Sequence, residues 1–101
     1  MSSARRILLV THTGREGAAA SAARLVERWH AADIEVVAPA EEAEELALPH
    51  LARWVPGQPV ELVLVLGGDG TILRGAELAR TAGTPLLGIN LGRVGFLAEA
   101  E

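Results

Sequence analysis

The sequence predicts an α/β fold, in which helices flank a parallel sheet in a Rossmann-like arrangement. Three observations lead to this prediction. Short, continuous apolar runs alternate with longer segments of helical periodicity along the 101 residues. The apolar runs are rich in Val, Leu and Ile, as in strands that are buried on both faces. The alternation predicts parallel strands that are joined by right-handed crossovers, and no repeat or low-complexity segment interrupts it.

The first third of the chain predicts strand, helix, strand. Residues 5–14, RRILLVTHTG, form an apolar run that ends in polar residues and glycine, as a buried strand does. Residues 14–33 are expected to form an amphipathic helix with a narrow apolar face that packs closely on a sheet. That face consists of Ala18, Ala22, Leu25, Trp29 and Ala32. Residues 34–39, IEVVAP, predict a second strand that stops at proline.

Residues 40–59 are the hardest part to assign. Their glutamates favour the start of a helix, whereas Pro49 breaks or restarts it. We expect the four glutamates to form a solvated face near a helix N-terminus, with a metal site as the alternative. They are Glu41, Glu42, Glu44 and Glu45.

The second half predicts strand, helix, strand. Residues 60–66, VELVLVL, are the clearest strand, and the sequence GGDGT follows them. Residues 72–83 show a helical stripe opposite three charged residues, and residues 84–90, TPLLGIN, are expected to form another strand. The stripe is Ile72, Leu73, Ala76 and Ala79, opposite Arg74, Glu77 and Arg80, and Gly83 is placed for a C-cap.

The composition excludes several classes of chemistry. The chain has no lysine, which removes a Walker-A lysine and Schiff-base mechanisms. It has no cysteine, which removes disulfides, thiol nucleophiles and cysteine-bound zinc. The net charge is −4 without a basic stretch, so no nucleic-acid partner is expected. The apolar runs are too short to cross a membrane, and we expect a cytoplasmic protein.

The GGDGT loop at residues 67–71 is the candidate ligand site. An Asp-Gly pair also favours a hairpin, but the helical period after Thr71 indicates a strand-to-helix connection. Ligands of parallel sheets bind beyond the carboxyl ends of the strands. Gly67 and Gly68 allow the backbone to approach a ligand closely, and the following helix N-terminus favours phosphate.

Polar residues near this loop leave several roles open. Asp69 could hold a metal, accept a proton from a hydroxyl group, or cap the helix. His12 is expected to be a polar strand-end residue, with a place in the same ligand crevice as the alternative. His30 and His50 have no partner at a metal-binding spacing and are expected at the surface or at helix ends.

Two motifs together resemble the N-terminal domain of NAD kinases. GGDGT occupies residues 67–71, and GINLGRVGFL at residues 88–97 fits the pattern G-x-N-x-G-x-x-G-F-L. HTGR at residues 12–15 extends the likeness over nearly the whole chain. GGDGT alone is shared with diacylglycerol and sphingosine kinases and, in related form, with phosphofructokinases. The second motif separates them, because lipid kinases carry a Gly-Thr-x-Asn-Asp segment that is missing here.

The resemblance implies transfer of a phosphoryl group to the 2′-hydroxyl of the adenosine ribose of NAD, which makes NADP. The donor is ATP or inorganic polyphosphate. By resemblance, Asp69 accepts the hydroxyl proton. The implied nucleotide-binding residues are Gly68, Asp69, Gly70, Thr71, Arg74, Asn90, Arg93 and Phe96. From the residues themselves, Arg74 could instead pair with Glu77 on the helix surface, and Phe96 could be a core residue.

The resemblance also implies partners and a further domain. A divalent metal, Mg²⁺ by expectation, is held mainly by the nucleotide phosphates and by no metal site of the protein. Residues 1–101 correspond to the N-terminal α/β domain, and the family's β-rich C-terminal domain is absent. We expect a dimer or tetramer for the full-length protein and no activity for residues 1–101 alone. The alternatives are a non-catalytic nucleotide-binding α/β module and a diacylglycerol-type lipid kinase.

Overall fold

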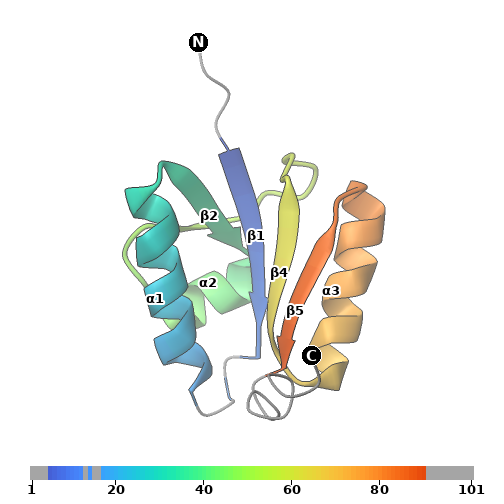
Figure 1. Ribbon diagram of the computed structural model, residues 1–101, viewed down its shortest axis with the longest axis horizontal. Helices are drawn as coiled ribbons and strands as arrows, with labels where there is room; N and C mark the ends of the chain where they lie inside the picture. The colour runs from blue at the N-terminus through green and yellow to red at the C-terminus, as the bar shows by residue number, and fades with distance from the viewer. Residues whose placement is uncertain (1–4, 13, 15–16, 91–101) are drawn as a thin grey trace.

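The computed structural model describes residues 5–12, 14 and 17–90, which form one five-stranded parallel sheet with helices on both faces (Figure 1). The strand order is β3-β2-β1-β4-β5. The predicted α/β fold is therefore confirmed. Its elements are β1 Arg5–Thr11, α1 Ala18–Ala31, β2 Ile34–Ala38, α2 Ala40–Leu46, β3 Leu51–Arg53, β4 Leu62–Gly67, α3 Asp69–Ala82 and β5 Leu86–Asn90.

The two central strands, β1 and β4, are buried on both faces. Alternate side chains of a strand point to opposite faces, so one set packs toward α1 and the other toward α3. Leu9 and Leu64 belong to the core that includes Val26 of α1. Leu8 and Val65 belong to the core on the other face. This two-sided burial explains why the sequence of these strands is continuously apolar rather than alternating.

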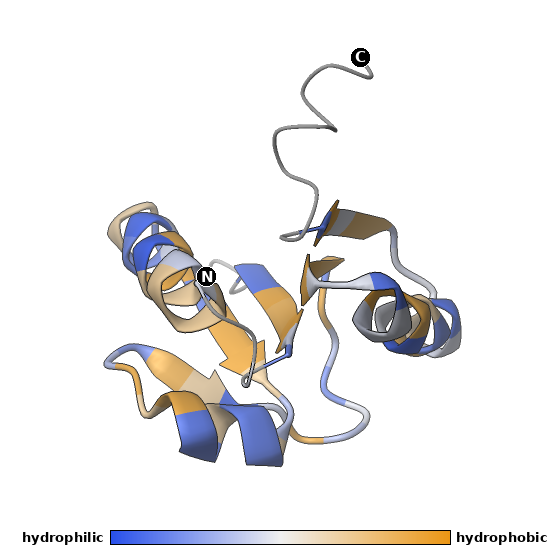
Figure 2. Cartoon of the chain, turned by 90° about the horizontal axis from the view of Figure 1, so that it is seen from below, coloured by the Kyte–Doolittle hydropathy of each residue, from blue (hydrophilic) through white to orange (hydrophobic). Residues whose placement is uncertain are grey.

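The helices that cover the sheet lie on opposite faces, α1 on one and α3 on the other (Figure 2). α3 approaches the sheet most closely at Gly75. A Cβ atom at Gly75 would lie 2.2 Å from Cγ2 of Val65 in β4, which is too close for two carbon atoms that are not bonded to each other. Glycine at this position therefore sets the spacing between α3 and β4.

Two of the expected helix faces are corrected by the structure. In α3 the buried residues are Thr71, Gly75 and Ala79, one every four positions, and Leu73 is 70% exposed. Leu73 lies two residues from this stripe and so points to the opposite side of the helix. In α1 the expected Ala32 is exposed, because the helix has already ended at Ala31.

β3 was missed in the sequence because it has only three residues. It follows a turn in which His50 has a φ of 67°, and it pairs with Val36 to Ala38 of β2. The N–H of Trp54 then donates to the carbonyl of Ala38 at 2.7 Å. Of the two alternatives at Pro49, the helix does not restart, because residues 51–53 pair with the edge of β2 instead.

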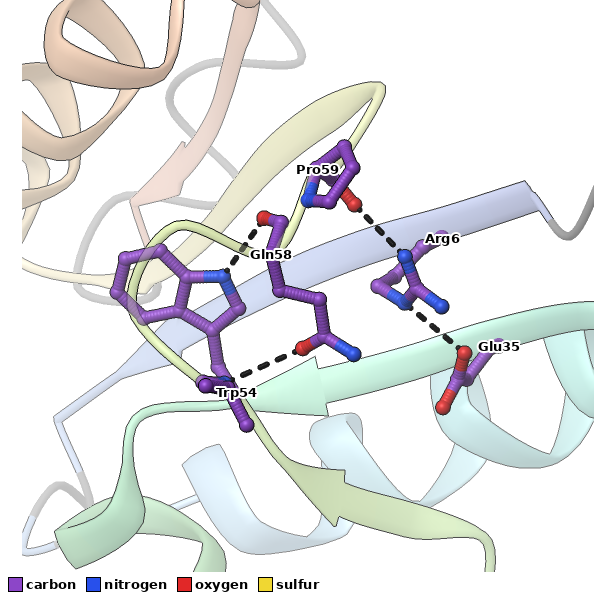
Figure 3. A network of polar contacts seen from close by, with 6 residues as sticks. Arg6, Glu35, Trp54, Gln58 and Pro59 are labelled. Atoms are coloured by element: carbon purple, nitrogen blue, oxygen red, sulfur yellow. Dashed lines mark hydrogen bonds and ion pairs between the residues drawn. The ribbon is translucent and has the colours of Figure 1, made fainter.

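The amino ends of the strands are tied together by polar contacts (Figure 3). Nε of Arg6 donates to Oε1 of Glu35 at 2.9 Å, and its Nη1 donates to the carbonyl of Pro59 at 2.9 Å. Arg5 binds Glu61 beside them, and its hydrogen bond holds the pKa of the Glu61 carboxyl below its ordinary value. These contacts fix the connection before β4 at the end of the sheet opposite to the GGDGT loop.

The ends of α3 differ from the expected ones only at the start. α3 begins at Asp69, two residues before the expected start near Thr71, while Gly83 is the C-cap as predicted, with a φ of 71°. Among the described residues, no helix has both the length and the apolar character needed to cross a membrane.

Candidate functional site

The candidate site lies where the carboxyl ends of β1, β4 and β5 meet. Thr11 at the end of β1 is paired with Leu66 of β4, and Gly67 is paired with Asn90 of β5. The N–H of His12 donates to the carbonyl of Leu66 at 3.2 Å. The chain leaves β1 toward β2 and leaves β4 toward β5, so β1 and β4 flank the point where the sheet order reverses. Ligands of open α/β sheets bind at this point.

Asp69 is the first residue of α3 and lies at this edge. Gly68 before it is the N-cap, with an extended backbone, and no side chain caps the helix. The Oδ1 atom of Asp69 accepts a hydrogen bond from Nδ2 of Asn90 at 3.1 Å. The capping alternative is therefore not observed. The structure instead joins the acid of the first motif to the asparagine of the second motif, 21 residues later.

The glycines of the loop have different surroundings. A Cβ atom at Gly67 would lie 2.9 Å from Cβ of Thr71, so this position has no room for a side chain. Thr71 is buried and fills the inside of the turn. A Cβ atom at Gly70 would meet nothing within 4 Å, so the space above Gly70 is open to a ligand.

Arg74 projects from α3 toward α2. Its Nη2 atom lies 2.6 Å from Oε2 of Glu42, whereas Glu77, the partner considered from the sequence, binds Arg80 at 3.2 Å. Glu42 is buried, so the expectation that all four glutamates are solvated is wrong for this one. Residue type and helical position did not reveal its burial, because its partner lies on another element 32 positions later.

A cavity of about 200 Å³ lies beside this ion pair and is lined by Thr11, His12, Glu41, Glu42, Glu45 and Arg74. His12 lines this cavity at the end of β1, and its place in a ligand crevice stays a prediction. Two buried side chains on this cavity have no hydrogen bond among the described residues: the hydroxyl of Thr11 and the carboxylate of Glu42, whose Oε2 atom lies 2.6 Å from Nη2 of Arg74 as an ion pair. Buried polar atoms are nearly always hydrogen-bonded, so these two mark the cavity as a place for a polar ligand or water.

The remaining histidines lie elsewhere. His30 and His50 are exposed as expected, and their rings stack with centroids 3.6 Å apart, a contact that the sequence did not show. In the described part of the chain, no three His, Cys, Asp or Glu side chains gather closely enough to hold a metal ion.

Several predicted site residues lie outside the described residues. They are Arg93 and Phe96, together with Gly92, Gly95 and Leu97 of the second motif and Thr13 and Arg15 of HTGR. Their roles stay predictions. Of the predicted set, the structure brings Asp69 and Asn90 together at the GGDGT loop, and it places Arg74 on the cavity at the carboxyl end of β1.

Comparison with known proteins identifies the family. Residues 7–101 match the family model described as the ATP-NAD kinase N-terminal domain. The chain belongs to the NAD kinase family. The resemblance drawn from the two motifs is thereby confirmed, and the family is that of the NAD kinases rather than that of the lipid kinases.

Individual NAD kinases align over nearly the whole chain. It is 50% identical to NAD kinase 2 of Streptomyces coelicolor, over 96% of the chain and 34% of that protein. It is 50% identical to the NAD kinase of Thermobifida fusca, over 96% and 32% respectively. It is 48% identical to the NAD kinase of Leifsonia xyli, over 100% and 36%. The chain spans about a third of the length of these NAD kinases.

Proposed function

We propose that this chain is the nucleotide-binding part of an enzyme that phosphorylates NAD to NADP, with ATP or inorganic polyphosphate as the donor. The observation that carries the proposal is the hydrogen bond between Asp69 and Asn90 at the edge of the sheet. It holds an exposed carboxylate beside an open glycine loop, at the position where parallel sheets bind their ligands. Family membership supports the choice of reaction.

In the proposed reaction, Asp69 accepts the proton of the 2′-hydroxyl of the adenosine ribose. The ribose oxygen forms a bond to the terminal phosphorus of the donor, and the bond from that phosphorus to the bridging oxygen breaks, which releases ADP or shortened polyphosphate. Such a transfer depends on position and charge more than on covalent chemistry. The amide of Asn90 holds one carboxylate oxygen of Asp69, which orients the other toward the substrate.

Positive charge for the phosphates comes from arginine and from a divalent metal in this proposal. Arg74 is the described arginine that lies on the cavity at the carboxyl end of β1. The described residues offer no set of three protein ligands for a metal, so Mg²⁺ would be held by the nucleotide phosphates. Its chemistry would be to neutralise charge on those phosphates.

The isolated chain is proposed to be inactive. It spans about a third of the relatives, and we propose that a β-rich domain in the rest of the full-length protein completes the site. The cytoplasmic location expected from the sequence also remains a prediction. So does the dimeric or tetrameric state that the resemblance implies for the full-length protein.

The test is the substitution Asp69→Asn in the full-length protein that carries this chain. Loss of the proton acceptor is expected to lower kcat by about a hundredfold or more, as for a general base. NAD binding, measured by calorimetry, is expected to persist. Asp33→Asn is the matched control, because Asp33 is exposed and its φ of 66° suits asparagine. Unchanged kcat in Asp69→Asn would contradict the role of Asp69, and an inactive wild type would contradict the proposed function.

A further inference from the structure

Glu42 is the one charged side chain that is buried in the described part of the chain. It lies in the first turn of α2 and is only 5% exposed. Removing a carboxylate from water costs several kcal/mol unless a partner compensates for it. A buried glutamate on a short surface helix therefore requires a reason that core packing does not give.

Its partner is the half-exposed Arg74. The guanidinium Nη2 of Arg74 lies 2.6 Å from Oε2 of Glu42, and the exposed fractions of the two side chains are 49% and 6%. The carboxylate is thus the fixed member of the pair, and the guanidinium is the member that reaches solvent. Arg74 pairs with Glu42 and not with Glu77, which lies about one turn further along α3 and binds Arg80.

The pair borders the cavity at the end of β1. The same cavity is lined by Thr11 and His12 and by two further carboxylates, Glu41 and Glu45, and the hydroxyl of Thr11 has no hydrogen-bond partner among the described residues. A guanidinium carries five N–H donors in a planar fork that suits phosphate. A free arginine side chain loses about 2 kcal/mol of rotamer entropy when a ligand fixes it, and a side chain held beforehand loses less.

We propose that Glu42 is a positioning residue, which holds the guanidinium of Arg74 at the cavity so that it faces the phosphate groups of the substrates. This inference rests on the proposed function. It assigns a role to α2, an element that neither motif includes. Glu42 acts through Arg74 alone, and its effect must therefore disappear when Arg74 is absent.

The test is a double-mutant cycle in the full-length protein, with NADP formation as the readout. Glu42→Gln is expected to lower kcat/KM about tenfold, because Arg74 is no longer held in place. Arg74→Ala is expected to lower it further. The double variant is expected to match Arg74→Ala, with no added loss from Glu42→Gln. Glu44→Gln is the matched control on the same helix, since Glu44 is exposed and pairs with Arg53, and it is expected to leave kcat/KM unchanged.

Two outcomes would overturn the inference. One is an unchanged kcat/KM in a folded Glu42→Gln variant, and the other is an equal loss with and without Arg74. If Glu42→Gln does not fold, Glu42→Asp keeps the charge and withdraws it by one methylene, and the same two criteria apply to it. An active wild type with either outcome refutes the role of Glu42 alone, whereas an inactive wild type refutes the proposed function.

Discussion

At the scale of single residues, two glycines are needed where the backbone packs too closely for a side chain. Gly75 lets α3 approach β4, and Gly67 makes room for the buried Thr71 inside the loop. Both are needed for space, because neither has a positive φ. The GGDGT loop therefore depends on how closely α3 packs against the sheet, and not only on the freedom of its own backbone.

Gly75→Ala is predicted to lower the free energy of unfolding by about 1–3 kcal/mol, the usual cost of overpacking. The new methyl group would lie 2.2 Å from Val65 in the middle of the sheet. Gly70→Ala in the same helix is the control, since its methyl group would meet nothing within 4 Å, and it is predicted to cost no stability. Urea denaturation followed by circular dichroism measures both, and equal midpoints would contradict the contact at Gly75.

At the scale of elements, the two helices α2 and α3 both end in a left-handed residue. Gly83 closes α3 with a φ of 71°, and Ala47 closes α2 with a φ of 47°. Glycine adopts this conformation without strain, whereas alanine is strained by its Cβ atom. The sequence predicted the cap at Gly83 and gave no sign of the cap at Ala47, because alanine is not a signal for it.

Exchanging glycine and alanine at the two caps is predicted to change the free energy of unfolding in opposite directions. Gly83→Ala is expected to lower the free energy of unfolding by about 1 kcal/mol, through backbone strain alone, since its methyl group meets nothing within 4 Å. Ala47→Gly is expected to raise it by about 0.5 kcal/mol, as relief of strain exceeds the entropy that glycine adds to the unfolded chain. Thermal unfolding of both variants checks the signs. A gain from Gly83→Ala would be incompatible with the observed cap.

At the scale of the whole molecule, burial is uneven across the sheet. The strands β1 and β4 are covered on both faces, whereas β5 at the edge leaves Leu86 36% and Leu87 50% exposed. Within the described residues β5 pairs with β4 alone. An edge strand with exposed leucines is a surface on which proteins associate.

Residues 1–101 in isolation are predicted to self-associate through this edge as their concentration rises. Leu87→Glu is expected to shift the population toward monomer, because a charge cannot be buried there without a partner. Val55→Glu is the control, since Val55 is 61% exposed but lies in the loop between β3 and β4 and not on β5. Sedimentation equilibrium distinguishes the two variants, and equal association constants would show that β5 is not the contact.

The sequence by itself determined the fold class, the order of the long elements and the position of the GGDGT loop. Strands buried on both faces need continuous apolar runs, and helices on a sheet need an apolar stripe, so both leave a local pattern. The GGDGT loop was expected at the carboxyl end of a parallel strand, and the resemblance implied Asn90, the last residue of β5, which the structure joins to Asp69. The resemblance to NAD kinases depended on these same residues.

Only the tertiary structure decided the contacts between elements distant in sequence. The three residues of β3 acquire their strand conformation from the neighbouring β2, and Leu73 is exposed because close packing selects Gly75 as the buried position. The burial of Glu42 depends on Arg74, which a different helix places 32 residues later. Ion pairs and short strands of this kind leave no local periodicity, because their stability comes from partners that the chain brings close only when it folds.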